Sequence, residues 1–146
     1  MFDMDIKDKQ ILEALQKNGR ISVSELAASL NMSDTPCLRR IRKLEQSGVI
    51  TGYRGCVDEK KLGYSVSVHA FVSLKSNSEL AGELFEKEVA EISQVIECSV
   101  IIGQHDYLLK VIAKDLVHYE SILKKQISNI DCIAKIESTV ELKSAL

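Results

Sequence analysis

The sequence lacks the cysteine and histidine patterns that bind metals or carry out redox chemistry. Its four cysteines, Cys37, Cys56, Cys98 and Cys132, are 19, 42 and 34 positions apart, and none belongs to a CxxC or Cys–His cluster. This spacing excludes zinc-binding and thioredoxin-like motifs. We expect reduced thiols in a cytoplasmic protein, with Cys98 and Cys132, which lie in apolar runs, in the core.

Enzyme motifs and membrane segments are absent from the sequence as well. It contains no Ser-His-Asp set, nucleophile motif or phosphate-binding glycine loop. No apolar stretch approaches the roughly 20 residues that cross a bilayer, and no cationic start precedes an apolar run. These absences predict a protein that is not an enzyme, binds no cofactor or metal and has no membrane partner.

The composition is that of a folded protein with an uneven charge. The chain has 146 residues, 45% apolar and 27% charged, enough for one ordinary domain or two small ones. Residues 1–50 carry eight Lys/Arg and seven Asp/Glu, whereas residues 51–146 carry eleven and fourteen. The net charge of −2 argues against a protein that coats DNA over its whole surface. A nearly neutral N-terminal part with one basic helix is still able to bind DNA through a few phosphate contacts.

That basic helix is predicted from Ser33 to Gly48, SDTPCLRRIRKLEQSG. Ser33 is a candidate N-cap, Pro36 suits a first turn, and Gly48 stands where a helix ends. At 100° per residue, one face is apolar and the opposite face is cationic, as in a helix that lies in a DNA groove. A solvated basic face is the alternative. The apolar face is formed by Cys37, Leu38, Ile41 and Leu44.

The outward face of this helix supplies the candidate DNA contacts. Thr35, Pro36 and Arg39 are the candidates for base edges, and Arg39 is suited to a bidentate contact with guanine. The remaining basic residues are expected to hold phosphates and set the register on the duplex. The full set is Ser33, Thr35, Pro36, Arg39, Arg40, Arg42 and Lys43.

Two shorter helices precede the basic helix and complete a helix-turn-helix pattern. Asp5 is a plausible cap for a helix through Asn18, and Ser22 with Glu25 fits a capping box. After Gly48 the sequence VITGYRG suits a short wing-like strand. Residues 1–52 are therefore predicted to form a winged helix-turn-helix DNA-binding domain. A three-helix protein-binding module is the alternative.

The second half alternates strand and helix patterns after a polar tether or hinge strand at residues 53–63. Residues 64–146 are predicted to form an α+β, ferredoxin-like βαββαβ domain with both helices on one sheet face. We expect the other face, rich in Val and Ile, to be covered by dimerisation. The predicted strands are 65–74, 95–103, 106–113 and 132–142, the second and third joined by a hairpin at Gln104 and His105, and the helices are 78–92 and 115–130.

Four motifs in order resemble the Lrp/AsnC, or feast/famine, family of transcriptional regulators. They are ILEALQKNGRISVSELA, TPCLRRIRKLEQSGVITGY, the Leu62–Gly63 pair and GQHDYLLKV, and together they extend over nearly the whole chain. The resemblance implies a C-terminal domain of the RAM type and a DNA-binding homodimer that assembles into octamers or similar rings. It further implies a small effector, usually an amino acid, bound between dimers.

Carried onto this sequence, the resemblance places the effector site at the GxxDY loop and the last strand. Asp106 is suited to bind the ammonium group of an amino acid, and glycine at position 103 permits close approach of a ligand carboxylate. From the residues alone, Asp106 is favoured as a turn former that caps the hairpin, Gln104 and His105 are solvent-facing hairpin residues, and Tyr107 is packed. The candidate effector residues are Gly103, Gln104, His105, Asp106, Tyr107, Ser138, Thr139 and Val140.

Two other functions fit the same architecture. Siroheme decarboxylases resemble this family in both halves, but the intact cationic face and the GxxDY loop argue against that enzyme here. A DNA-organising protein of low sequence specificity is the second alternative, because repeated dimers along DNA bind by avidity.

Overall fold

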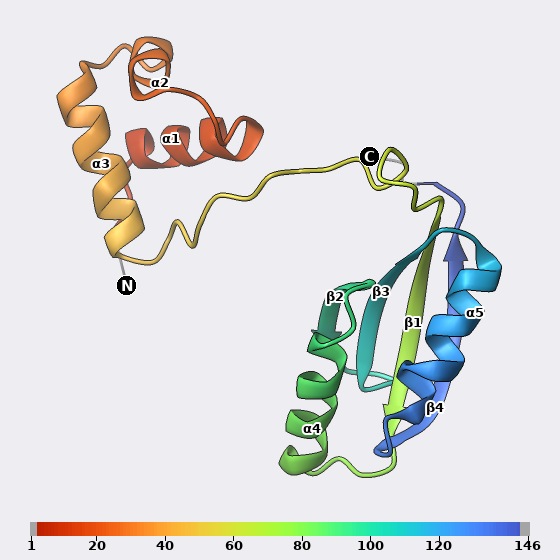
Figure 1. Cartoon of the computed structure of the whole chain (residues 1–146). Coiled ribbons are helices and arrows are strands. Elements are labelled where there is room, and N and C mark those ends of the chain that lie inside the picture. The colour runs from red at the N-terminus through yellow and green to blue at the C-terminus, as the bar shows by residue number, and fades with distance from the viewer. Residues whose placement is uncertain (1–2, 144–146) are drawn as a thin grey trace. The chain divides into compact units, whose positions relative to one another are not determined.

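The computed structural model describes residues 3–143, and the chain divides after Cys56 into two compact units, each with its own apolar core (Figure 1). The N-terminal unit is helical. The second unit has the predicted order of strands and helices. The elements are α1 (Ile6–Lys17), α2 (Val23–Ser29), α3 (Asp34–Gln46), β1 (Val66–Leu74), α4 (Glu79–Ala90), β2 (Val95–Val100), β3 (Tyr107–Ala113), α5 (Leu116–Lys125), a 3-10 turn η1 (Ile127–Asn129) and β4 (Ile133–Glu141).

Capping boxes begin the first two helices, which confirms the cap predicted at Asp5 and the box predicted at Ser22 and Glu25. The Asp5 carboxylate accepts a 2.9 Å hydrogen bond from the Asp8 backbone N–H. The Asp8 carboxylate in turn accepts a 3.1 Å hydrogen bond from the Asp5 backbone N–H. Ser22 and Glu25 form the same reciprocal pair at the start of α2. Each box satisfies backbone donors that a helix start leaves without partners.

A tight turn joins α2 to α3. Asn31 has φ of 52°, a left-handed conformation that asparagine tolerates better than most residues. The Met32 N–H donates to the Ala27 carbonyl at 2.9 Å, and the Asn31 N–H donates to the Ala28 carbonyl at 3.2 Å. This pair of bonds is a Schellman motif, which ends α2 and reverses the chain into α3.

The segment after α3 differs from its prediction. Gly48 ends the helix with φ of 75°, as expected. The described residues from 49 to 65 contain no strand in the single chain, so the wing has no strand there and, of the predicted tether or hinge strand, the tether is the form seen. A strand requires a neighbouring backbone to pair with, and apolar residues between glycines do not supply one.

The second unit is a four-stranded antiparallel sheet in the order β2-β3-β1-β4, and the ferredoxin-like prediction is confirmed. Two boundaries differ. The β2–β3 hairpin has a six-residue loop, 101–106, and not the two residues predicted, because β2 ends at Val100. The last helix ends at Lys125 and is followed by η1.

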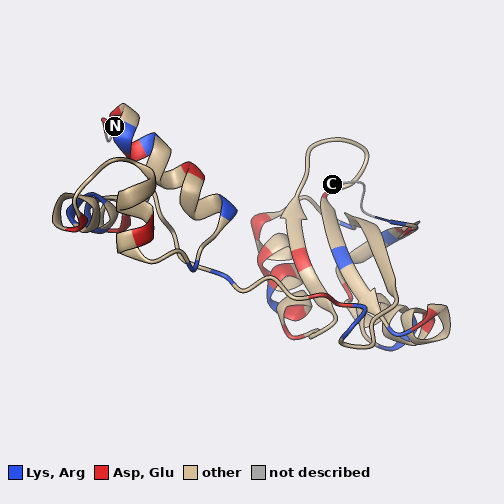
Figure 2. Ribbon diagram, turned by 90° about the horizontal axis from the view of Figure 1, so that it is seen from above, with Lys and Arg blue, Asp and Glu red and all other residues tan. Residues whose placement is uncertain are grey.

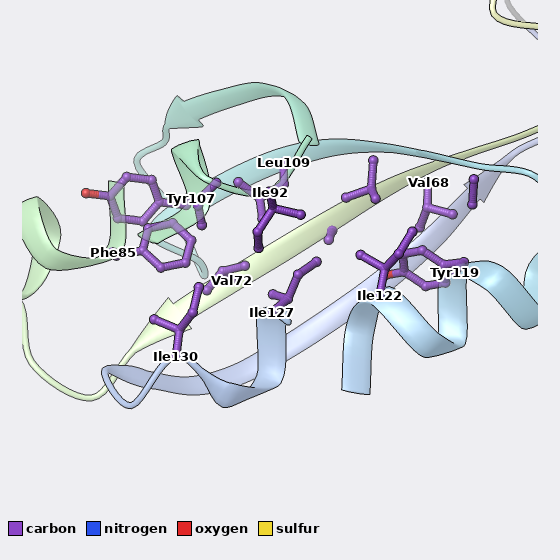
Figure 3. Packing of buried hydrophobic residues seen from close by; sticks show 14 residues of the cluster. Val68, Val72, Phe85, Ile92, Tyr107, Leu109, Tyr119, Ile122, Ile127 and Ile130 are labelled. Carbon is purple, nitrogen blue, oxygen red and sulfur yellow. The ribbon is translucent and has the colours of Figure 1, made fainter. Parts of the chain in front are cut away.

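The core of this unit lies between one sheet face and the helices α4 and α5 (Figure 3). Val68, Ala70 and Val72 alternate along β1 and are fully buried on that face. Phe85 of α4 packs against Tyr107 of β3, with ring centroids 4.5 Å apart. The period-two pattern of β1 thus correctly identifies the buried face.

The other sheet face is less apolar than predicted. Cross-strand register places His69 between Lys110 and Thr139, and Phe71 between Leu108 and Glu137. The expectation of a face rich in Val and Ile is wrong, because the valines of β1 point into the core. This open face carries Ser67, His69, Phe71, Ser73, Leu108, Lys110, Ile112, Glu137, Thr139 and Glu141.

The prediction that Cys98 and Cys132 lie in the core is wrong for Cys98 and only partly correct for Cys132. Cys132 is half-buried and packs against the core, but Cys98 is exposed on the edge strand β2. An apolar run at a sheet edge does not ensure burial, since only one side of an edge strand has a neighbour. Among residues 3–143, no helix is both long and apolar enough to cross a bilayer.

Candidate DNA-binding and effector sites

The outward face of α3 is exposed and cationic. Arg39, Arg42 and Lys43 are exposed, in a run that carries no acid between Thr35 and Leu44. Figure 2 colours the Lys and Arg residues of the chain blue and the Asp and Glu residues red. A shallow hollow lies on this face, lined by Thr35, Leu38, Arg39, Arg42, Lys43 and Gln46. Leu38 is only half-buried and borders the hollow, so the prediction that it belongs to the packing face is correct only in part.

Arg40 does not belong to this outward face. Its Nη1 donates to Asp5 Oδ2 at 2.6 Å and to Asp8 Oδ1 at 2.8 Å, which ties α3 to the start of α1. These hydrogen bonds raise the pKa of Arg40, Asp8 being the larger cause, and the pKa of Asp5 is lowered first by the Asp8 N–H and then by Arg40. The phosphate contact predicted for Arg40 stays a prediction, and its Nη1 is bonded within the protein.

Ser33 and Pro36 lie at the start of α3. Ser33 occupies the N-cap position, but its hydroxyl makes no capping hydrogen bond, so the predicted cap is wrong as regards the side chain. Ser33 is exposed and stays in the predicted set of DNA contacts. Pro36 lies in the first turn as predicted and is half-buried. The Ser24 hydroxyl donates a 2.5 Å hydrogen bond to Asp34, which joins α2 to the start of α3.

The loop at 101–106 carries most of the candidate effector residues. Gly103 and Gln104 are exposed. Gly103 has φ of 156°, and no atom lies within 4 Å of a Cβ built on it. The glycine is therefore required by the backbone conformation and not by lack of space.

Asp106 anchors this loop to the end of β1. Its Oδ2 accepts a 2.7 Å hydrogen bond from the Leu74 N–H, and its own N–H donates to the Val72 carbonyl at 2.9 Å. Its carbonyl accepts from the Ile101 N–H at 2.9 Å and closes the loop. The turn-forming role open in the sequence is real, and Oδ1 is the carboxylate oxygen that this structure leaves for a ligand.

Asp106 also lines a small hollow beside α4. The hollow has a volume of about 170 Å³ and is lined by Leu74, Asn77, Ser78, Gly82, Val100, Ile101, Asp106 and Tyr107. Drug-sized pockets occupy roughly 300–1,000 Å³, so this space suits a much smaller molecule. The sequence did not identify Asn77, Ser78 and Gly82 as site residues, because only the tertiary structure brings the start of α4 next to the loop.

His105 points onto the open sheet face, away from the hollow. Its Nδ1 lies 3.1 Å from the Ser73 hydroxyl and its Nε2 lies 3.0 Å from Glu137 Oε2. Its ring also packs near Phe71, with centroids 5.4 Å apart. His105 is thus a fixed part of the sheet face, and Gln104 is the exposed one of the two loop residues.

Tyr107 is buried and bonded to α4. Its hydroxyl donates a 2.8 Å hydrogen bond to Glu86 Oε1, which packs the residue after Asp106 against the helix. Burial, then the hydrogen bond to Glu86 and the Glu86 charge, raise the pKa of Tyr107 to about 12. The packed role weighed for Tyr107 is confirmed, and its ring edge still borders the hollow.

Within one chain, the loop and the predicted wall on β4 do not come together. The loop contacts β4 at Glu137 through His105. Ser138, Thr139 and Val140 pair with Ala70, His69 and Val68, which precede Leu74 on β1 and lie farther from the loop. Successive strand residues point to opposite faces, so Thr139 faces the open side. Ser138 faces the helices and its hydroxyl lies 2.5 Å from that of Tyr119. No cluster of three His, Cys, Asp or Glu able to hold a metal occurs among residues 3–143.

Comparison with known proteins matches both units. A family model described as winged helix-turn-helix DNA-binding matches residues 4–51, and the Lrp/AsnC ligand binding domain matches residues 67–146. The chain is 37% identical to the Bkd operon transcriptional regulator of Pseudomonas aeruginosa over 146 residues, covering 100% of this chain and 95% of that protein. It is also 37% identical to a proline dehydrogenase transcriptional activator of Rhizobium radiobacter, covering 97% and 91%.

Solved structures agree over the full length. A Neisseria meningitidis transcriptional regulator in complex with L-Met superposes with a TM-score of 0.93 at 26% identity, covering 99% of this chain and 93% of that one. AsnC of Escherichia coli superposes with a TM-score of 0.86 at 29% identity, covering 99% and 96%. The chain therefore belongs to the Lrp/AsnC family of transcriptional regulators, with a DNA-binding helix-turn-helix unit followed by the family's ligand binding domain.

Proposed function

We propose that this protein is a cytoplasmic, non-enzymatic regulator whose DNA binding is controlled by an amino acid. The observation that carries the proposal is the pairing of a cationic, exposed α3 with a second unit whose hollow holds a carboxylate, Asp106. DNA is the partner of the first unit and the effector is the partner of the second. The named relatives are transcriptional regulators, and one of the similar structures was solved with L-Met.

The outward face of α3 is the proposed DNA contact. Thr35 and Arg39 lie at its leading end, where a recognition helix contacts base edges, with Pro36 beside them. Arg42 and Lys43 follow one turn later and suit phosphate oxygens. Ser33 adds an exposed hydroxyl at the helix start. Each phosphate contact made by a cation gives a defined salt dependence, so the assignment can be measured residue by residue.

The loop around Asp106 is the proposed effector site. An amino acid carries an ammonium group, which Asp106 Oδ1 can bind while Oδ2 keeps its bond to the Leu74 N–H. Gly103 and Gln104 are exposed and do not line the hollow of the single chain; the Gly103 backbone is the proposed contact of the ligand carboxylate and Gln104 that of the ligand side chain. Tyr107 forms a wall of the same hollow.

A complete site requires a second chain. Ser138, Thr139 and Val140 are separated from the loop in the same chain, so their contribution to the site requires a loop from another copy. This supports a homodimer that assembles further, to an octamer or similar ring, with the effector held between dimers. An effector bound at such an interface can shift assembly only by binding one arrangement more tightly than another.

DNA binding is tested by fluorescence anisotropy with labelled duplexes over a range of salt concentrations. We expect Arg39→Gln and Arg42→Gln each to weaken binding. For Arg42→Gln, the plot of log affinity against log salt loses about 0.9 of its slope per contact. Lys17→Gln, at the exposed end of α1, is the matched control and keeps the parent affinity and slope. Parent-like binding by both arginine variants would show that α3 is not the DNA contact.

Effector binding is tested by calorimetry against the twenty amino acids. Asp106→Asn is the informative variant, because its amide oxygen still accepts from the Leu74 N–H while the negative charge is lost. We expect it to lose binding of the amino acid that the parent protein selects, with an unchanged fold by circular dichroism. Undiminished binding by Asp106→Asn would rule out the ammonium contact.

A further inference from the structure

Arg40 joins α3 to two carboxylates, Asp5 and Asp8, at the start of α1. Its Nη1 donates to Asp5 Oδ2 and Asp8 Oδ1. The other oxygens of these carboxylates, Asp5 Oδ1 and Asp8 Oδ2, accept the reciprocal N–H bonds of the capping box. All four carboxylate oxygens are therefore used, and Asp8 is only 7% exposed. Arg40 thus completes an ion cluster that begins α1, and we call these three residues the clamp.

The clamp lies directly beside the proposed DNA face. A hollow of about 480 Å³ is lined by Asp3, Asp5, Asp8, Arg39, Arg40 and Lys43. Arg39 and Lys43 also line the outward hollow of α3. Residues 39 and 43 are one turn apart on the helix, and Arg40 lies about 100° around from Arg39. A small rotation of α3 about its axis would therefore displace both Arg39 and Lys43.

The clamp adds a directional constraint to the apolar packing beneath α3. Cys37, Ile41 and Leu44 pack against Ile11 and the α2 residues, and apolar burial is non-directional. Hydrogen bonds from a guanidinium to two carboxylates are directional and constrain both the rotation of α3 and its position along α1. The Asp8 side chain is buried, whereas those of Arg40 and Asp5 are 30% and 53% exposed, so the constraint comes from the direction of the hydrogen bonds and not from burial of the whole cluster.

We propose that Arg40 is a positioning residue for DNA recognition, seated on Asp5 and Asp8, which orients α3 so that its outward residues meet base edges in register. It acts through α3 and does not touch DNA. The proposal rests on the assignment of α3 as the DNA contact. It predicts that loosening the clamp reduces sequence discrimination, whereas removing a phosphate contact weakens binding to all sequences alike.

The test compares two duplexes: one enriched by the parent protein from a random-sequence library, and one with the same bases in scrambled order. We expect Arg40→Gln to weaken binding to the enriched duplex about tenfold, the size of one lost base contact, and to the scrambled duplex by less than about twofold. The salt slope stays at the parent value because no phosphate contact is lost.

Two further variants separate positioning from folding. Asp8→Asn removes the buried negative charge that Arg40 binds and is expected to reproduce the loss of discrimination between the two duplexes. The double variant Arg40→Gln/Asp8→Asn leaves no unpaired buried charge and is expected to bind no worse than either single variant, because all three disrupt the same unit. Arg40→Lys keeps the positive charge and is expected to discriminate between the two duplexes better than Arg40→Gln does. Circular dichroism at the binding temperature establishes that each variant is folded.

Arg42→Gln is the matched control and separates the possible failures. It should weaken both duplexes equally and reduce the salt slope by about 0.9. If Arg40→Gln behaves in the same way, Arg40 is a phosphate contact and the positioning proposal is wrong. If folded Arg40→Gln keeps parent affinity for both duplexes while Arg42→Gln loses it, the clamp serves stability alone. If neither variant changes binding, the assignment of α3 itself fails.

Discussion

The hydroxyl of Tyr107 lies 2.8 Å from Glu86 Oε1, and this bond joins the start of β3 to the middle of α4. Gly82 makes the approach possible, since a Cβ at that position would lie 2.9 Å from the Tyr107 hydroxyl oxygen. Tyr107 directly follows Asp106, so the contact also fixes the loop that carries the proposed ligand carboxylate.

Gly82→Ala should destabilise the protein, against the usual direction for a glycine inside a helix. Alanine is normally favoured over glycine there by up to about 1 kcal/mol. Here the new methyl group displaces a ring that packs on Phe85, and such overpacking costs ~1–3 kcal/mol. Urea unfolding of the single variants and of Gly82→Ala/Tyr107→Phe measures the free energy of unfolding of each and so the cost of the contact between the methyl group and the hydroxyl. In the double variant the hydroxyl is gone, and we expect Gly82→Ala to be neutral or stabilising.

Tyr107 should be the tyrosine that ionises last. Its pKa is raised to about 12 by burial first and by Glu86 second. Unfolded tyrosine ionises near pH 10, so the raised value contributes stability that is present below about pH 10 and is lost as pH rises toward 12. An ultraviolet absorbance titration detects tyrosinate directly. The Tyr107→Phe protein should lack the step at the highest pH, and retention of that step would assign it to another tyrosine.

Protonation of Asp5 in acid should weaken its ion pair with Arg40 in the clamp. The pKa of Asp5 is lowered by the Asp8 N–H and by Arg40, so its ionised form contributes stability above its unfolded pKa near 3.8. That contribution is lost as pH falls through the lower, folded-state value. The melting temperature of the parent protein should therefore fall more steeply below about pH 4 than that of Asp5→Ala. Parallel curves for the two proteins would contradict the assignment.

Local signals in the sequence were sufficient for most elements. Capping residues such as Asp5 and Ser22 act within one turn, and the alternation along β1 reports its own buried face. The order of strands and helices followed from these patterns and from the family resemblance. Gly48 marked the end of α3 for the same local reason.

Features that depend on distant partners were not predictable in this way. Arg40 looked like its neighbours Arg39 and Arg42 until α1 placed two carboxylates beside it. The composition of the open sheet face depended on which side of β1 met the helices. Asp106 is both a loop anchor and a candidate ligand group, and only the folded structure shows that its Oδ2 is bonded to the Leu74 N–H.

The central claim is that an amino acid bound at the Asp106 loop controls DNA binding by α3. It is tested most directly by titrating labelled duplex with parent protein and with Asp106→Asn, each with and without the amino acid that calorimetry identifies. We predict that the amino acid changes the apparent DNA affinity of the parent protein. We also predict that Asp106→Asn binds the duplex but does not respond. An equal response from both proteins would contradict the account.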